Sequence, residues 1–128
     1  MKLLLDTHSF LWWIGNDNRL SDTAREAIAD VNNDIFFSVV SAWEMAIKIR
    51  TGKLSMEAEL AGFLKKHLYS NALSVLPISL QHAWQIAHLP LLHRDPFDRM
   101  LVAQAQVEKA QLITADPEIN NYAVNICW

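Results

Sequence analysis

The sequence predicts an α/β fold in which helices cover a mainly parallel sheet. Short apolar runs typical of strands alternate along the chain with longer segments in which apolar residues recur at helical spacing. The connections between these segments are short, and strands that alternate with helices in this way form parallel sheets. The chain has 128 residues, of which 52% are hydrophobic, so we expect a single domain over residues 1–128 with a packed core.

In the first half of the chain, cap and turn residues separate the expected elements. Ser21 before Asp22 is typical of a helix N-cap with an acidic first turn, and Gly52 is typical of a helix end. The run from Ile35 to Val40 is rich in β-branched and aromatic residues, which favours a strand. The elements expected here are a strand over 2–5, helices over 7–14 and from 22 onward, a strand over 35–40, and a helix from Ser41 to Gly52.

In the second half of the chain, prolines mark where the expected helices end and begin. Pro90 ends an expected helix, and Asp95 followed by Pro96 is typical of the cap and first position of the next one. The elements expected here are a helix around 60–68, a strand over 73–78, helices over 81–88 and 97–109, and strands over 111–114 and 124–128.

Four acidic residues stand where an expected strand gives way to a helix, or where a helix opens. Asp6, Glu44 and Asp116 follow three of the strands, and Asp98 opens the helix over 97–109. In an open α/β sheet, the side chains beyond the carboxyl ends of the strands meet in one crevice, which is the usual ligand site. We therefore expect these carboxylates to gather at one edge of the sheet.

Each of these acids also has a local explanation as a helix cap. Residues 41–44, Ser-Ala-Trp-Glu, fit a capping box; Asp98 can complement a helix dipole, and Asp116 before Pro117 can start a helix. Independent caps would still crowd together at one edge of a parallel sheet. Two carboxylates about 4 Å apart repel each other by roughly 4 kcal/mol at an effective dielectric constant of 20.

A divalent cation relieves such repulsion, and oxygen ligands favour Mg²⁺ or Mn²⁺. One or two such ions can activate water and stabilise the leaving oxygen of a phosphodiester. The acidic cluster therefore predicts metal-assisted phosphodiester hydrolysis.

Composition excludes several other classes. The net charge of −3 argues against a large basic surface for nucleic acids, although a bound metal would supply positive charge locally. The apolar stretches are far shorter than the ~20 residues of a spanning helix, so we expect no membrane segment. Cys127 is the only cysteine, which excludes an internal disulfide and a thiolate zinc site and predicts a cytoplasmic protein.

Two further function classes find little support. A phosphatase of the haloacid dehalogenase type needs a second aspartate two residues after its nucleophile, where this chain has His8. The chain has only three glycines and no glycine-rich phosphate loop, so we expect no nucleotide cofactor. A non-catalytic Rossmann-like binding module remains as an alternative.

Five motifs in order along nearly the whole chain resemble those of PIN-domain proteins, and more narrowly those of VapC-type ribonuclease toxins of bacterial type II toxin–antitoxin systems. The motifs are Leu-Leu-Leu-Asp-Thr-His over 3–8, Trp43-Glu44 with Lys48, Gly-Lys-Leu over 52–54, His-Arg-Asp-Pro-Phe-Asp-Arg over 93–99, and Leu-Ile-Thr-Ala-Asp-Pro over 112–117.

The resemblance implies a three-layer α/β/α sandwich with a parallel sheet of four or five strands. It also implies an endoribonuclease dependent on Mg²⁺ or Mn²⁺, a homodimer, and inhibition by a cognate antitoxin protein. A non-toxin RNA-processing nuclease of the same family is the alternative.

The acidic ligands of the family map onto Asp6, Glu44, Asp98 and Asp116. Asp95 lies one helical turn from Asp98 on the same face, which leaves open which of the two contacts metal. The residues that follow Asp98 fit the family helix and favour Asp98 as the ligand.

Each basic residue near these acids has two possible roles. Lys48 stands four residues after Glu44, so it can form a helix salt bridge or contact a substrate phosphate. Arg99, and less so Arg94, can hold RNA phosphates or lie on a solvated surface. His8 and His93 can be metal ligands or proton carriers, with structural histidines as the default.

Two adjacent tryptophans bear on the expected partners. Trp12 and Trp13 point about 100° apart on a helix and cannot both face one core. Either one of them is exposed and lines a groove for an antitoxin helix or a dimer contact, or the helix is buried all round.

Overall fold

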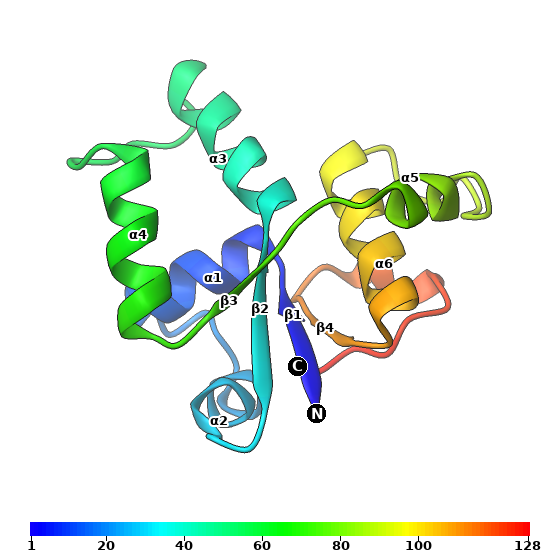
Figure 1. The fold of residues 1–128 in the computed structure, drawn as a ribbon, viewed down its shortest axis with the longest axis horizontal. Helices are drawn as coiled ribbons and strands as arrows, with labels where there is room; N and C mark the ends of the chain where they lie inside the picture. Colours follow the sequence, from blue (N-terminus) through cyan, green and yellow to red (C-terminus); the bar gives the residue numbers. More distant parts are fainter.

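The computed structural model describes residues 1–128 and has a four-stranded sheet between two groups of helices (Figure 1). All paired strands run parallel, in the order β3-β2-β1-β4. The elements are β1 (Lys2–Leu5), α1 (Thr7–Ile14), α2 (Asp22–Ala29), β2 (Asp34–Ser38), α3 (Val39–Arg50), α4 (Leu60–Ser70), β3 (Ser74–Leu76), α5 (Leu80–Ile86), α6 (Pro96–Glu108), β4 (Gln111–Ile113) and the 3₁₀ helix η1 (Pro117–Asn121). The expected α/β class and three-layer sandwich are confirmed.

The central strand β1 supplies the core on both faces of the sheet. Leu3 and Leu5 point to the side of α1 to α4, and Leu4 points to the side of α5, α6 and η1. All three are fully buried, because successive side chains of a strand alternate between two faces that helices cover here. The apolar run after Lys2 therefore reflects a strand buried on both sides.

The strand order creates a topological switch point beside β1. The chain proceeds from β1 outward to β2 and β3, and then returns to form β4 on the other side of β1. In doubly wound folds, the crevice at the carboxyl ends of the two strands flanking such a reversal is the usual ligand site. Here those strands are β1 and β4, which Asp6 and Ala115-Asp116 follow closely.

Helix α3 begins at Val39, two residues before the predicted start at Ser41. Ser38 is its N-cap, and the Ser38 hydroxyl accepts a hydrogen bond from the Val40 N–H at 3.0 Å. Val39 and Val40, expected at the end of a strand, are the first residues of the helix instead. Sheet pairing ends at Ser38, so the β-branched pair lies beyond the last strand partner.

The prediction of a strand over 124–128 is wrong. Only Ile126 forms a bridge there, opposite Leu112. The Leu112 N–H donates to the Asn125 carbonyl at 2.8 Å and the Cys127 N–H donates to the Leu112 carbonyl at 3.0 Å. Strand β3 is also shorter than expected, since Pro77 has no N–H to continue the ladder.

The paired tryptophans of α1 are both half-buried, and His8 on the same helix is exposed, so neither expected alternative holds: no tryptophan is fully exposed, and the helix is not buried all round. Trp13 Nε1 donates to Asn71 Oδ1 at 3.1 Å, and Trp12 packs against the rings of His8 and Trp128. No helix in the structure combines the length and the apolar character needed to cross a membrane.

Candidate active site

The acidic residues that the sequence singled out converge on one cavity of about 370 Å³. It lies beyond the carboxyl ends of β1 and β4, the strands that flank the switch point. Its lining residues are Asp6, Thr7, His8, Trp12, Glu44, Lys48, His93, Asp95, Asp98, Ala115 and Asp116. The structure thus brings together all five candidate acids from four separate parts of the chain.

Asp6 and Asp116 act as helix caps and also belong to the cavity. Asp6 Oδ1 accepts the Ser9 N–H at 2.8 Å and caps α1, and Asp116 Oδ1 accepts the Glu118 N–H at 2.9 Å and caps η1. The second oxygen of Asp116, Oδ2, lies 3.0 Å from His93 Nε2. Capping occupies one carboxylate oxygen of Asp116 and leaves the other facing the cavity.

Glu44 lies within α3, so the capping box expected for residues 41–44 is wrong. The side chain of Glu44 is only 4% exposed and has two polar partners. Its Oε1 accepts the Thr7 hydroxyl at 2.7 Å, and its Oε2 pairs with the Lys48 ammonium. Thr7 Oγ1 also lies 2.9 Å from the hydroxyl of Ser41, which is buried in the same helix. Glu44 is therefore a buried carboxylate oriented across the α1–α3 contact.

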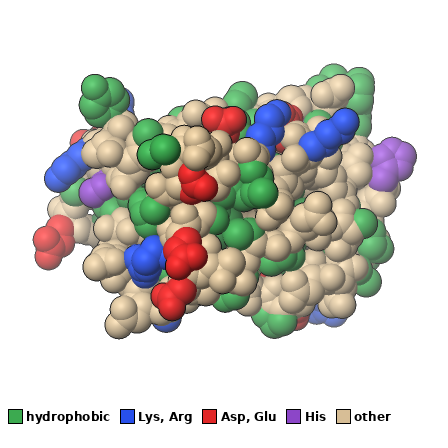
Figure 2. Space-filling view, turned by 90° about the horizontal axis from the view of Figure 1, so that it is seen from below, with side chains coloured by type: hydrophobic (Ala, Val, Ile, Leu, Met, Phe, Trp, Pro, Cys, Tyr) green, Lys and Arg blue, Asp and Glu red, His purple; other side chains and the backbone are tan.

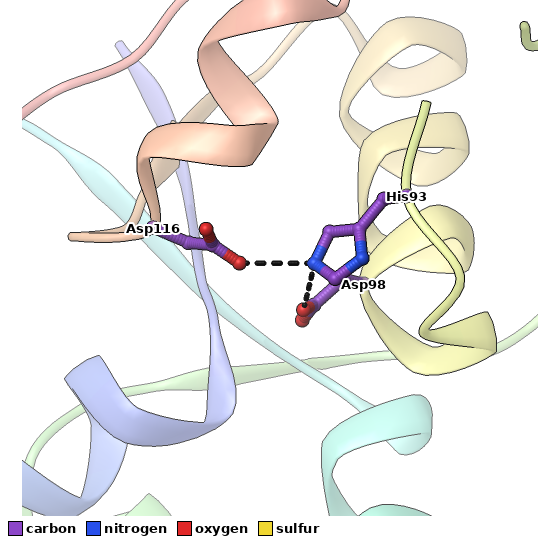
Figure 3. Close-up of side chains that lie close together, drawn as sticks. All are labelled: His93, Asp98 and Asp116. Carbon is purple, nitrogen blue, oxygen red and sulfur yellow. Dashed lines mark hydrogen bonds and ion pairs between the residues drawn. The ribbon is translucent and has the colours of Figure 1, made fainter. Parts of the chain in front are cut away.

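The structure distinguishes Asp95 from Asp98. Asp95 Oδ1 accepts the N–H groups of Phe97 and Asp98 at 2.9 and 3.3 Å, so Asp95 is the N-cap of α6. Asp98 Oδ2 instead lies 3.1 Å from His93 Nε2. Figure 3 shows His93 between Asp98 and Asp116. The facing atoms of these three residues lie within 4.8 Å of one another.

His93 is the functional candidate that sequence reasoning left as structural by default. Besides its contacts to the two carboxylates, its backbone N–H donates to Tyr122 Oη at 2.8 Å. The sequence signals were its place at the start of the motif over 93–99 and its position two residues before Asp95, because the loop that carries it has no periodic pattern. His8 also lines the cavity, but its exposed ring stacks on Trp12 with centroids 5.7 Å apart.

Arg99 does not line the cavity, so its role as a phosphate contact stays a prediction. Its side chain is 9% exposed. Its Nη1 donates to the Pro90 carbonyl at 2.7 Å and to Tyr122 Oη at 3.2 Å. Arg99 thereby fastens the loop that carries His93. Arg94 is exposed and also lies outside the lining, whereas Lys48 is part of it.

The crowded carboxylates shift one another's protonation. Burial raises the pKa of Asp98 to about 7, helped by the charges of Asp95, Asp6 and Glu44. Burial also raises the pKa of Asp6, against the lowering effect of its hydrogen bonds to Ser9 and Thr114. A cluster that holds a proton at neutral pH is one that a cation would relieve.

The same charges also change the pKa of His93. Burial acts to lower its pKa, but the hydrogen bond to Asp116 and the charges of Asp98, Asp116 and Glu118 outweigh burial and raise it. The carboxylates therefore stabilise the positive form of the imidazole more than water does for an isolated histidine. A cationic group suits this position.

Seen from the side of α2, acidic and basic side chains are scattered among apolar and neutral ones (Figure 2).

Comparison with known proteins places the chain in a family. A family model described as PIN domain matches residues 3–125. Among solved structures, the chain is similar to VapBC2 from Rickettsia felis bound to a promoter DNA fragment, with a TM-score of 0.73 and 16% identity over 98% of this chain and 97% of that chain. It is also similar to VapBC-1 from nontypeable Haemophilus influenzae, with a TM-score of 0.65 and 18% identity over 98% and 96% of the two chains.

A third similar structure is FitAcB from Neisseria gonorrhoeae, with a TM-score of 0.67 and 15% identity over 98% of this chain and 96% of that one. No curated protein matches the chain significantly.

Proposed function

Because the chain belongs to the PIN-domain family, we propose that its acidic cavity is the active centre of an endoribonuclease that depends on Mg²⁺ or Mn²⁺. PIN domains are in general nucleases that use divalent metals. The observation that carries the proposal is the convergence of Asp6, Glu44, Asp98 and Asp116 on one cavity at the switch point of the sheet.

The residues present suit a hard divalent cation. The cavity offers carboxylate oxygens from four parts of the chain, and burial, together with the charges of Asp95, Asp6 and Glu44, raises the pKa of Asp98 to about 7. Oxygen ligands of this kind are those that Mg²⁺ and Mn²⁺ take in proteins. Asp6, Glu44, Asp98 and Asp116 would hold one or two ions, with Asp95 as the cap that orients the first turn of α6.

A bound divalent ion would lower the pKa of a water nucleophile and stabilise the charge on the phosphate oxygens. Side chains of the protein orient and neutralise the other charged groups of the cavity. Thr7 orients Glu44 through its hydroxyl, and Lys48 offsets the negative charge of Glu44 at the cavity. Lys48 is also the basic side chain in the cavity lining that can bind an RNA phosphate.

RNA cleavage by the purified protein tests this proposal. We expect cleavage of single-stranded RNA with Mg²⁺ or Mn²⁺, none with EDTA, and none for Asp6→Asn, whose amide oxygen still caps α1. Asp22→Asn, an exposed first-turn acid of α2 outside the cavity, is the matched control and should cleave normally. Cleavage that persists in EDTA and in Asp6→Asn would contradict the mechanism. RNA binding without cleavage would favour a non-catalytic module.

We further propose that the nuclease is a toxin controlled by a cognate antitoxin. The support is the likeness of the chain to VapBC and FitAB complexes, with 15 to 18% identity. A short open reading frame beside the gene, whose product copurifies with this chain and suppresses cleavage, is the expected result. Cleavage without growth arrest on expression would favour an RNA-processing nuclease instead.

A homodimer is part of the same proposal. Light scattering of the purified chain should give twice the monomer mass, and a monomer mass at micromolar concentration would contradict it.

A further inference from the structure

His93 is a nitrogen donor inside a cavity otherwise rich in carboxylate oxygens. Its Nε2 lies 3.0 Å from Asp116 Oδ2 and 3.1 Å from Asp98 Oδ2, and the imidazole ring points between the two carboxylates (Figure 3). Ligands at right angles around an ion with bonds of about 2.1 Å lie about 3.0 Å apart. The same spacing thus suits a hydrogen-bonded imidazole and a shared metal ion.

Buried polar groups hold the loop that carries His93 in place. Tyr122 Oη accepts the His93 N–H at 2.8 Å and also the Arg99 Nη1 at 3.2 Å. Arg99 in turn donates to the Pro90 carbonyl at 2.7 Å. Tyr122 and Arg99 are both buried, so the backbone of His93 is fixed relative to α6 and η1. A ligand needs this kind of support, because affinity depends on its position being set in advance.

The second ring nitrogen of His93 has the partner that metal-binding histidines usually have. Nδ1 lies 3.2 Å from Glu118 Oε2, and a metal-binding histidine commonly donates its other N–H to a carboxylate. Nδ1 also lies 3.3 Å from the Asp95 amide nitrogen. With the proton on Nδ1, Glu118 becomes the acceptor and the Nε2 lone pair faces Asp98 and Asp116.

We propose that His93 is a direct metal ligand through Nε2, together with Asp98 and Asp116, and that it makes the site prefer Mn²⁺ over Mg²⁺. Both ions take carboxylate oxygens, but Mn²⁺ is a first-row transition metal and accepts a nitrogen ligand more readily than Mg²⁺, which keeps oxygen ligands and waters. Glu118 is a positioning residue that fixes the tautomer of His93. The inference rests on the proposed function only in placing a metal in this cavity.

Pulsed electron paramagnetic resonance of Mn²⁺ bound to the purified protein tests the ligand directly. We expect nitrogen hyperfine coupling from a coordinated imidazole, with a pattern that changes when the histidines carry ¹⁵N. The isotope needs no substitution, so this arm does not depend on the folding of a variant. Absence of nitrogen coupling, or absence of Mn²⁺ binding, overturns the proposal.

Substitutions identify which of the five histidines is the ligand. His93→Gln should lose the nitrogen coupling and bind Mn²⁺ about tenfold or more weakly, while its Mg²⁺ affinity changes much less. His88→Gln, an exposed histidine outside the cavity, is the matched control and should keep both. Glu118→Gln should keep the coupling but weaken Mn²⁺ binding. Coupling that survives in His93→Gln, or that disappears only in His8→Gln, overturns the assignment.

These outcomes separate the ligand from the nuclease function. RNA cleavage with Mn²⁺ but without nitrogen coupling would refute His93 as a ligand and leave the nuclease proposal standing. Nitrogen coupling without cleavage would support the ligand and refute the nuclease.

Discussion

The hydroxyl of Thr7 lies 2.7 Å from Glu44 Oε1, which joins the first turn of α1 to the middle of α3 across 37 residues of sequence. Glu44 is almost fully buried, and a buried carboxylate needs hydrogen-bond donors to remain stable. Thr7 therefore contributes to the shape of the cavity without itself being an acid.

Replacing Thr7 by valine should destabilise the protein. The substitution keeps the shape of the side chain but leaves Glu44 Oε1 without its donor, at a cost of about 1–3 kcal/mol in the free energy of unfolding. Thr7→Ser, which retains the hydroxyl, should lose far less. Urea unfolding of the three proteins at neutral pH measures the difference, and equal stabilities for valine and threonine would show that the hydrogen bond contributes nothing.

The protonation of Asp98 should appear in the pH dependence of stability when EDTA is present. Burial and the neighbouring acids raise its pKa from 3.8 to about 7, so the folded protein binds this proton more tightly than the unfolded chain does. The resulting stabilisation is complete below about pH 3.8 and is lost as the pH rises through about 7.

Asp98→Asn carries no such proton, so its stability should not show this loss. We expect the variant to be more stable than the original protein above pH 7 in EDTA, and similar to it near pH 4. Urea unfolding at both pH values measures this. Added Mn²⁺ should reverse the order above pH 7, because the ion stabilises the protein that retains its ligand. A difference that does not vary with pH would contradict the raised pKa.

Removing the hydroxyl of Tyr122 should loosen the loop of His93. Tyr122→Phe deletes the acceptor of the His93 N–H and the partner of Arg99, which should cost about 1 kcal/mol of stability and slow RNA cleavage severalfold. The movement should be visible as a shift in the His93 ring resonances. Tyr69→Phe, at the other tyrosine, which is 91% exposed, is the control and should change none of these. Unchanged His93 resonances in Tyr122→Phe would argue against this anchor.

Lys48 should contribute one phosphate contact to RNA binding. Lys48→Gln is expected to weaken binding and to reduce the slope of log affinity against log salt concentration by about 0.7, the value for one phosphate on a single strand. Fluorescence anisotropy with labelled RNA in the Asp6→Asn background measures binding without cleavage. Lys53→Gln changes the net charge equally but at an exposed position outside the cavity, and it should leave the slope almost unchanged. Equal slopes for the two lysine variants would place the contact elsewhere.

The acidic cavity followed from the sequence to a large extent. Asp6 and Asp116 each follow an apolar strand, and both are caps, as their local sequences indicate. Parallel strands bring such positions to one edge whatever the details of packing. The sequence could not predict that Ser38, and not Ser41, caps α3, because either serine can cap a helix. The end of the pairing between β2 and β3 decided it.

Local sequence patterns could not predict the roles of Arg99 and His93. Arg99 is one residue from Asp98 in the sequence, yet its side chain points away from the cavity to Pro90 and Tyr122. His93 lies in a loop, where neither a helical nor a strand period indicates a direction. Both depend on Tyr122, which is more than twenty residues away along the chain.

The sequence by itself determined the alternation of strands and helices, and with it the edge of the sheet where four carboxylates meet. Periodicity, caps and breakers act between residues that are near neighbours in the chain, and they can therefore be read from it. Only the tertiary structure decided that the side chains of Asp98 and His93 face each other at that edge and that Arg99 lies beneath the loop. Those directions are set by hydrogen bonds and packing between segments far apart in sequence, which no local pattern encodes.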